Sequence, residues 1–259
     1  MRLDAFLVQN GYFESRTKAA EALRRGDVLV DGIARKASYE PLENAEIKIV
    51  KKFPFVSEGG QKLQTALDDF LLTVCGQVFV DFGASTGGFT HCLLLSGAKR
   101  VYAVDVGDSQ LHPTLASDDR VIVMDKTNAR YLTCTNFNDQ IDGAVMDVSF
   151  ISQKLMYEAL SSVVKDGGNV ITLVKPQFEC GKSALNKNGI VKDVKQHEKV
   201  ICDLMDAART YGLFAQNLTT APIKPKKNIE YLLWFTKGGT QKLNAQSVKD
   251  IIYKQGENR

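Results

Sequence analysis

Short apolar runs alternate with amphipathic stretches along most of this chain. The apolar runs have the length of buried strands and cover residues 78–80, 101–104, 121–124, 144–146, 170–174 and 231–235. Between them, apolar residues recur at helical spacing in residues 60–71, 89–95, 152–164 and 194–211. This alternation predicts an α/β fold of the Rossmann-like kind, a doubly wound and mostly parallel sheet with helices on both faces.

The helix predicted after Gly59 and Gly60 has the most regular pattern. Its apolar positions follow the i, i+3, i+4, i+7, i+8 rule and are expected to be buried: Leu63, Ala66, Leu67, Phe70 and Leu71. Lys62 lies off this stripe in the first turn, where a positive charge is unfavourable beside the helix dipole. The lysine is therefore either tolerated at the surface or retained for catalysis.

The first 50 residues have a different pattern, which predicts a separate small α+β module. Two short helices are indicated by apolar residues at helical spacing: Leu3, Phe6 and Leu7, then Ala19, Ala22 and Leu23. Ser15 is placed to cap the second helix, and Gly26 to end it. Residues 28–30 then form a strand that enters a tight turn at Asp31-Gly32, with residues 47–50 as a closing strand.

The length of 259 residues allows one sizeable α/β core and this smaller module. We expect a small domain in residues 1–50, a linker in residues 51–59, the α/β domain in residues 60–237, and a tail in residues 238–259 with room for one helix.

Composition narrows the class of protein. The net charge is only +3, so a nucleic-acid surface must be a local patch. Five cysteines without C-x-x-C spacing indicate reduced thiols, and three scattered histidines make a metal site unexpected. The N-terminus has no secretory apolar core, and no run is long enough to cross a bilayer. We therefore expect a cytoplasmic protein.

Residues 81–90, with the sequence DFGASTGGFT, form a glycine-rich turn between a predicted strand and a predicted helix. Glycines allow a ligand to approach the backbone, and a helix start offers free N–H groups. Asp105 ends the next strand about 20 residues later, where α/β cofactor sites place the carboxylate that binds ribose hydroxyls. The unit therefore predicts a nucleotide or nucleoside site.

The turn also limits the choice of cofactor. Its spacing is not G-x-G-x-x-G, because Ser85 and Thr86 interrupt it, and no Gly-Lys-Ser/Thr follows. A ligand without phosphates fits best, and S-adenosylmethionine (SAM) is such a ligand, with its ammonium group near Asp81 and its ribose near Asp105. On this loop alone, a nicotinamide cofactor remains the alternative.

Charged residues follow the strands at one edge of the predicted sheet. Asp81, Asp105, Asp125, Asp147 and Lys175 all lie at carboxyl ends of strands, where such sheets bind ligands. Burial and the nearby Lys62 both disfavour an ammonium on Lys175, which predicts a neutral amine able to act as a general base. Asp147 would orient Lys175, and Glu230 would hold Lys62 or the reacting hydroxyl.

Lys62, Asp147, Lys175 and Glu230 resemble, in chain order, the Lys-Asp-Lys-Glu tetrad of the FtsJ-like ribose 2′-O-methyltransferases. Residues 83–90, 104–107, 127–130, 147–152 and 175–179 are similar to the TlyA group, whose members carry an old haemolysin label. Residues 15–32 resemble the RNA-binding module named after the fourth small-subunit ribosomal protein. The resemblance implies methylation of a ribose 2′-hydroxyl, of cytidine, in ribosomal RNA.

The candidate site residues follow from these patterns. The tetrad is catalytic, and the cofactor-binding residues are Asp81, Gly83, Ala84, Ser85, Thr86, Gly87, Gly88, Phe89, Asp105, Val106, Asp125, Lys126 and Asp147. The RNA-binding residues are Arg2, Arg16, Lys18, Arg24, Arg25, Lys182, Lys226 and Lys227. From charge alone, the basic residues of the second helix fit a solvated face equally well. The expected partner is ribosomal RNA within ribosomal subunits, with no membrane, DNA or metal.

Three other functions remain to be separated from the methyltransferase. A catalytically silent RNA-binding or ribosome-assembly factor would bind SAM without turnover, and the intact tetrad opposes it. A membrane-active haemolysin would lyse membranes without SAM, and a nicotinamide dehydrogenase would need the missing pyrophosphate fingerprint.

Overall fold

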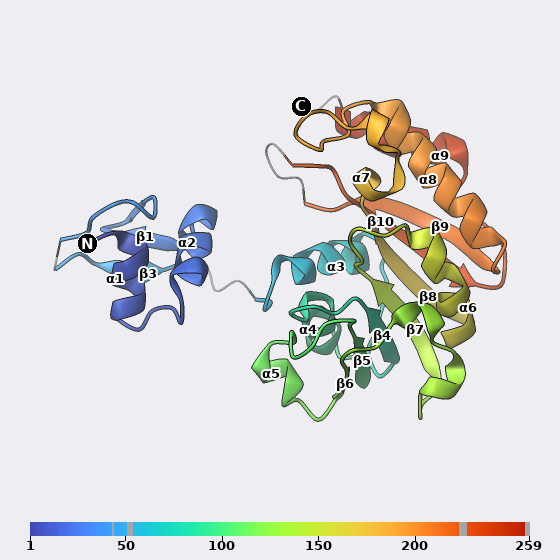
Figure 1. Ribbon diagram of the computed structural model, residues 1–259, viewed down its shortest axis with the longest axis horizontal. Coiled ribbons are helices and arrows are strands. Elements are labelled where there is room, and N and C mark those ends of the chain that lie inside the picture. Colours follow the sequence, from blue (N-terminus) through green and yellow to red (C-terminus); the bar gives the residue numbers. More distant parts are fainter. Residues whose placement is uncertain (43, 51–53, 223–226, 257–259) are drawn as a thin grey trace. The chain divides into compact units, whose positions relative to one another are not determined.

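The computed structural model describes residues 1–42, 44–50, 54–222 and 227–256, with the side chains of Arg25, Gln255 and Gly256 outside the description. The chain divides into two compact units, Met1–Pro54 and Phe55–Arg259 (Figure 1). The second unit begins earlier than residue 60, because the segment before the first long helix already packs on its core.

The N-terminal unit has the two predicted helices and a small antiparallel sheet. Its elements are α1 (Leu3–Gln9), α2 (Arg16–Arg25), β1 (Val28–Val30), β2 (Ile33–Ala34) and β3 (Ile47–Ile49), with strand order β2-β1-β3. The Ser15 side chain accepts a hydrogen bond from the Lys18 N–H and caps α2, while Gly26 ends the helix with φ +79°. The predicted α+β module is confirmed.

The second unit is built on a seven-stranded sheet with the order β6-β5-β4-β7-β8-β10-β9. The strands are β4 (Val78–Phe82), β5 (Arg100–Val104), β6 (Val121–Met124), β7 (Ile141–Met146), β8 (Val164–Val174), β9 (Leu213–Thr220) and β10 (Tyr231–Lys237). Strands β4 to β8 pair in parallel, and β10 runs antiparallel to both of its neighbours. The predicted mostly parallel sheet is confirmed.

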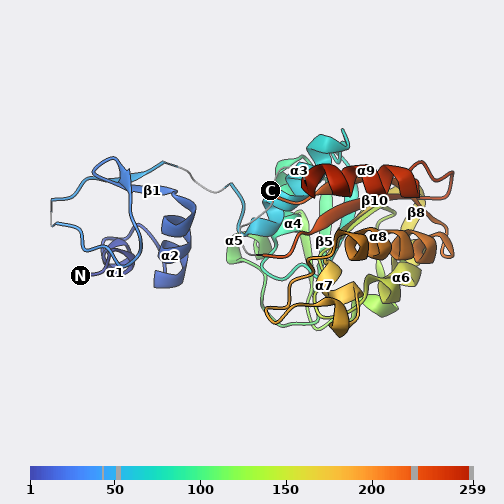
Figure 2. The same ribbon diagram turned by 90° about the horizontal axis from the view of Figure 1, so that it is seen from above.

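Helices cover both faces of this sheet. The α-helices are α3 (Glu58–Asp69), α4 (Gly88–Leu95), α5 (Pro113–Ala116), α6 (Tyr157–Val163), α7 (Pro176–Glu179), α8 (Val194–Arg209) and α9 (Ala245–Gly256). Four 3₁₀ turns are η1 (Ala129–Tyr131), η2 (Cys134–Asn136), η3 (Gln153–Met156) and η4 (Lys182–Ala184). One core cluster joins the sheet to α6, α8 and α9, and the other joins it to α3, α4 and α5. Figure 2 shows α6 and α8 together on one side of the sheet.

The buried apolar stripe of α3 ends at Phe70, one residue earlier than predicted. Leu63, Ala66, Leu67 and Phe70 are buried, but Leu71 is 92% exposed. Helix α3 ends at Asp69, and Leu71 adopts φ +53°, which turns its side chain away from the helical face. The expectation that Leu71 is buried was wrong, because periodicity alone does not mark where a helix stops.

Two strand assignments also differ from the prediction. Strand β8 begins at Val164 and continues through Gly167 and Gly168, whereas the apolar pattern predicted a strand only from residue 170. Strand β9 was not predicted, because Gln216, Asn217 and the final threonines interrupt its apolar residues. It is the last strand at one edge of the sheet and pairs with β10. Two of its polar residues, Gln216 and Thr220, are nevertheless buried.

The C-terminal segment belongs to the second unit and packs on its core. Leu243, Val248 and Ile252 belong to the same core cluster as α8, which explains the amphipathic pattern of α9. No helix within the described part of the chain has both the length and the apolar character needed to cross a membrane.

Candidate active site

Glycines allow the loop after β4 to meet the end of β7. Gly83 and Gly87 adopt φ +84° and +89°, and Ser85 between them adopts φ +47°. A Cβ atom on Gly83 would lie 2.8 Å from the carbonyl oxygen of Asp147, and one on Gly88 would collide with the Ser57 side chain. The loop therefore requires glycine both for backbone conformation and for close packing.

This loop forms one wall of a cavity of about 180 Å³ at the carboxyl edge of the sheet. The cavity is lined by Ser57, Gly59, Gly83, Ala84, Ser85, Thr86, Gly88, Phe89, Asp147, Ser149 and Lys175. Predicted residues from three distant segments thus come together. Ser57, Gly59 and Ser149 were not predicted; the first two come from the start of α3, and Ser149 follows Asp147 by two residues.

Asp81 lies beneath the loop and is fully buried, with 0% exposure. Its Oδ2 accepts hydrogen bonds from the Thr90 backbone N–H at 2.9 Å and from the Thr90 hydroxyl at 2.7 Å. Its Oδ1 has no hydrogen-bond partner among the described residues. Burial raises the pKa of Asp81 to about 7. A buried carboxylate oxygen without a donor is costly, so this position fits a cationic ligand group.

Asp105, at the end of β5, holds the loop in place. Its two oxygens accept hydrogen bonds from the backbone N–H groups of Ser85 at 2.8 Å and Gly107 at 2.7 Å. A carboxylate has about four lone-pair positions, so Asp105 retains acceptor capacity for ribose hydroxyls. Its neighbour Val106, also predicted in the cofactor site, is largely exposed.

Asp125 and Lys126, which were also predicted in the cofactor site, contact the loop that follows β5. Asp125 accepts a hydrogen bond from the Ser109 N–H at 3.0 Å, and the Lys126 amine forms an ion pair with Asp108 at 2.7 Å. Neither lines the cavity described above, and Lys126 adopts φ +53°. Gly87 packs against leucines, since a Cβ atom there would collide with Leu115.

The four tetrad residues assemble as two ion pairs. Lys175 Nζ lies 2.5 Å from Asp147 Oδ1 and donates to the Ser149 hydroxyl at 2.7 Å. Lys62 Nζ donates to Glu230 Oε2 at 2.5 Å. Val174 pairs with Tyr231 across β8 and β10, so the antiparallel register brings the next residues, Lys175 and Glu230, side by side. The fold therefore gathers all four side chains at one edge of the sheet.

The charge beside Lys175 is the carboxylate of Asp147. Lys175 is 9% exposed, and its Nζ lies 2.5 Å from Asp147 Oδ1. The prediction of a neutral amine rested on burial and on Lys62, and the structure adds this carboxylate to the surroundings of the amine. The neutral amine stays a prediction.

An aromatic pair, exposed at Phe150 and half-buried at Phe178, lies on the segments that follow Asp147 and Lys175. Phe150 is 89% exposed, and its ring centroid lies 4.9 Å from that of Phe178. Phe150 follows Asp147 by three residues, and Phe178 follows Lys175 by three. Phe150 also adopts φ +65°, a strained conformation for a bulky residue and one that concentrates at functional sites. Sequence analysis missed this pair, because neither exposure nor backbone strain is visible in the sequence.

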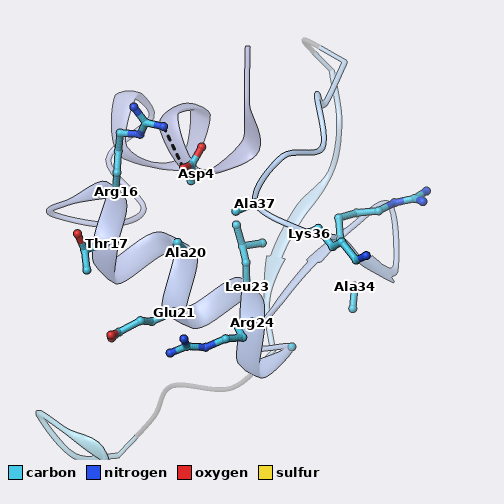
Figure 3. A pocket seen from close by; sticks show the side chains of 12 residues that line it. Asp4, Arg16, Thr17, Ala20, Glu21, Leu23, Arg24, Ala34, Lys36 and Ala37 are labelled. Atoms are coloured by element: carbon cyan, nitrogen blue, oxygen red, sulfur yellow. Dashed lines mark hydrogen bonds and ion pairs between the residues drawn. The ribbon is translucent and has the colours of Figure 1, made fainter. Parts of the chain in front are cut away.

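The N-terminal unit carries a separate basic groove, shown in Figure 3. The groove encloses about 1060 Å³ and is lined by Asp4, Arg16, Thr17, Ala20, Glu21, Leu23, Arg24, Gly26, Ala34, Arg35, Lys36 and Ala37. Arg16 and Arg24 were predicted to bind RNA, while Arg35 and Lys36 were left out of that prediction. Arg35 stacks over the Tyr39 ring at 4.6 Å, which fixes its guanidinium.

Two acidic residues, Asp4 and Glu21, line this groove, and Asp4 is paired with arginines. It accepts hydrogen bonds from Arg2 at 3.1 and 3.2 Å and from Arg16 at 3.1 Å. These guanidinium groups, that of Arg2 above all, lower the pKa of Asp4 to about 2. Asp4 therefore fixes two predicted RNA-binding arginines.

The other predicted RNA-binding residues lie elsewhere or are not described. Lys18 forms an ion pair with Glu14 and does not line the groove. Lys182 and Lys227 are exposed on the second unit. The Arg25 side chain and all of Lys226 lie outside the described residues.

Comparison with known proteins gives this architecture a family. Residues 55–237 match the FtsJ-like methyltransferase family, which is well over half of the chain. The chain belongs to the FtsJ-like methyltransferases. Residues 1–47 match the S4 domain, in agreement with the basic module. Family membership decides between the two cofactor classes that the glycine loop left open, in favour of a methyl donor.

Several FtsJ-like relatives share both domains. The chain is 36% identical over 257 residues to the 16S/23S rRNA (cytidine-2′-O)-methyltransferase TlyA of Mycobacterium tuberculosis, covering 98% of this chain and 96% of the relative. It is 38% identical over 241 residues to Hemolysin A of Brachyspira hyodysenteriae, covering 91% and 99%. A solved structure of a protein from Streptococcus thermophilus that carries the name hemolysin is 38% identical, with a TM-score of 0.78. The match covers 100% of this chain and 98% of that chain.

Proposed function

We propose that this protein transfers the methyl group of SAM to a ribose 2′-hydroxyl, of cytidine, in ribosomal RNA. The observation that carries the proposal is that Lys175 and Asp147 line a glycine-walled cavity at one sheet edge. The register of β8 and β10 places a second lysine–carboxylate pair, Lys62 and Glu230, beside the first. The family match and the relative named as a cytidine-2′-O-methyltransferase support the same activity.

The described residues fit SAM. Asp81 offers an unpaired buried oxygen to the ammonium group, and Asp105 offers acceptor capacity to the ribose hydroxyls. Gly83 and Gly88 let the loop pack closely on Asp147 and Ser57, which shapes the wall of the cavity proposed for the nucleoside. When bound, SAM supplies an electrophilic methyl carbon on a sulfonium, whose transfer needs an aligned nucleophile rather than a metal.

The tetrad residues divide the remaining work. Lys175 and Asp147 form one coupled unit, and this unit takes up the proton of the attacking hydroxyl. Ser149 fixes the lysine amine, since it accepts the second hydrogen bond from Nζ. Lys62, held by Glu230, presents a positive charge that orients the hydroxyl oxygen. Holding the oxygen, methyl carbon and sulfur in line supplies much of the rate.

RNA recognition uses both units. The groove residues Arg16, Arg24, Arg35 and Lys36 bind phosphates, which gives affinity without sequence readout. On the second unit, Phe150 offers an exposed ring beside the ion pairs, suited to stack a base displaced from its helix. The ribosomal subunit is the proposed setting of this RNA.

The test is transfer of labelled methyl from SAM to ribosomal subunits that lack the modification. We expect label in RNA, recovered after digestion as 2′-O-methylcytidine and resistant to alkaline cleavage on its 3′ side. Label in a base-methylated nucleoside, or in protein, would contradict the proposed chemistry. No label in any substrate, with SAM bound, would indicate an RNA-binding factor without turnover.

A further inference from the structure

Two loops carry the catalytic residues, and they run side by side. The first follows β7 and leads from Asp147 to η3, while the second follows β8 and leads from Lys175 through α7. The ion pair between Asp147 and Lys175 joins the loops at their start. The distance between Asp147 and Lys175 is held more firmly when the far ends of both loops are fixed as well.

Glu179 joins the far ends. It is the last residue of α7, and both of its carboxylate oxygens accept hydrogen bonds from the first loop. Oε2 accepts from the Ser152 hydroxyl at 2.7 Å, and Oε1 accepts from the Gln153 backbone N–H at 2.8 Å. Together with the ion pair, these bonds close a ring of two short segments, 147–153 and 175–179.

Neutral contacts support the same ring. The Gln153 side chain is 2% exposed and donates to the Leu173 carbonyl at 2.6 Å, which ties the first loop to β8. Phe150 and Phe178 contact each other across the two loops. Glu179 differs from the residues that make these neutral contacts because it is charged. Within the segments 147–153 and 175–179, the other charged residues are Asp147 and Lys175, the catalytic pair.

We propose that Glu179 is a positioning residue for methyl transfer, which fixes the distance between Asp147 and Lys175 by holding their loops together. This inference rests on the proposed function for its effect on rate. A carboxylate is required because two donors converge on it from one side, and charged acceptors make the stronger hydrogen bonds. A glutamine keeps one carbonyl acceptor for the Gln153 N–H, but its NH2 group can only donate. The Ser152 hydroxyl must then change from donor to acceptor, and the charge that strengthens both bonds is lost.

The proposal separates rate from cofactor binding. Glu179 does not line the cavity, and among the described residues it makes no hydrogen bond or ion pair with Asp81, Asp105 or the glycine loop, the groups proposed to hold SAM. Its loss therefore acts mainly on the distance between Asp147 and Lys175. Misplacement of reacting groups by about 1 Å costs up to about 100-fold in rate. We therefore expect Glu179→Ala to lower the single-turnover rate by about 10- to 100-fold and Glu179→Gln to lower it less. The dissociation constant for SAM should change by less than about twofold in both variants.

The experiment compares full-length wild type, Glu179→Ala, Glu179→Gln and the control Glu158→Ala. Glu158 is an exposed glutamate on α6 and lies outside the ring. Single-turnover methyl transfer, SAM binding and melting temperature are measured on each. Two further variants test the hydrogen bond between Ser152 and Glu179. They are the single variant Ser152→Ala and the double variant Ser152→Ala/Glu179→Gln. If Glu179 acts through Ser152, the double variant loses less than the product of the two single losses.

Hydrogen exchange gives a readout that does not depend on activity. Peptides covering residues 148–156 and 175–182 should exchange faster in Glu179→Ala than in wild type, and at the wild-type rate in Glu158→Ala. Unchanged exchange in both peptides, or an unchanged transfer rate in Glu179→Ala, would overturn the proposal. A parallel loss of rate, SAM affinity and melting temperature would also overturn it, in favour of a purely structural role. If wild type transfers no methyl, the proposed function fails, and faster exchange still supports the link between the loops.

Discussion

At the residue scale, Asp81, which we propose to bind the SAM ammonium group, lowers the stability of the protein at neutral pH. Asp81 is buried beside the glycine loop, and one of its oxygens has no donor among the residues described. The ordinary pKa of this group is 3.8, and burial raises it to about 7 in the folded protein. The folded state therefore binds the proton more tightly than the unfolded chain, so stability from this group is present at low pH and is lost as the pH rises from about 4 to about 7.

Replacing Asp81 by asparagine should remove this cost and the function with it. Asparagine keeps an acceptor for Thr90 but carries no charge. We expect Asp81→Asn to raise the free energy of unfolding at pH 8 by about 1–3 kcal/mol, with the gain shrinking as the pH falls toward 5. SAM affinity should fall by at least about tenfold. Denaturant unfolding and calorimetric titration measure the two effects, and a variant that binds SAM like wild type would remove Asp81 from the site.

Phe150 gives a second prediction at this scale. Its ring is exposed and its backbone is strained, so truncation removes a surface for RNA without removing core packing. We expect Phe150→Ala to reduce kcat/KM for RNA by at least about tenfold while melting temperature and SAM affinity stay at wild-type values. Leu71→Ala is the matched control, since Leu71 is also exposed and also adopts positive φ. Equal activity of the two variants would show that Phe150 does not contact the substrate.

At the element scale, strand ends carry the function, and this much was predictable from sequence. Apolar runs that stop at Asp81, Asp105, Asp147 and Lys175 predicted both a parallel sheet and a common edge for these residues. Strand β9 was not predicted, because Gln216, Asn217 and the closing threonines break its apolar pattern. The sequence suggested that Asp147 orients Lys175 and that Glu230 could hold Lys62. The distances within these pairs were not predictable, since they depend on the register of β8 and β10.

The groove on the N-terminal unit supports a prediction at the scale of elements. Residues of α2 and of the segment after β2 face one cavity, while Lys18 lies outside it. We expect neutralisation of Arg24, Arg35 and Lys36 together, each by glutamine, to weaken RNA binding. The slope of log affinity against log salt should fall by about 2, because each lost phosphate contact removes about 0.7–0.9.

Lys18→Gln is the control for this measurement. It removes a positive charge of the same helix that is already paired with Glu14. If Lys18→Gln reduces affinity and salt slope per charge as much as the triple variant does, binding reflects overall charge and not the groove.

At the scale of the whole molecule, one chain joins an S4 domain to a methyltransferase domain. Each unit has its own core, so each could be recognised in the sequence by its own periodicity. The division of labour follows from chemistry. In the proposed function, basic side chains of the first unit give general affinity for RNA, and the carboxyl edge of the second unit holds the groups that transfer the methyl.

The most direct test of this account is methyl transfer to unmodified ribosomal subunits by Lys175→Ala, with SAM binding measured on the same preparation. Lys192→Ala is the control, because Lys192 is an exposed lysine outside the cavity. We predict that Lys175→Ala loses at least about 100-fold in rate while it binds SAM normally, and that Lys192→Ala keeps the wild-type rate. Substantial ribose methylation by Lys175→Ala would contradict the role of the Lys175–Asp147 pair.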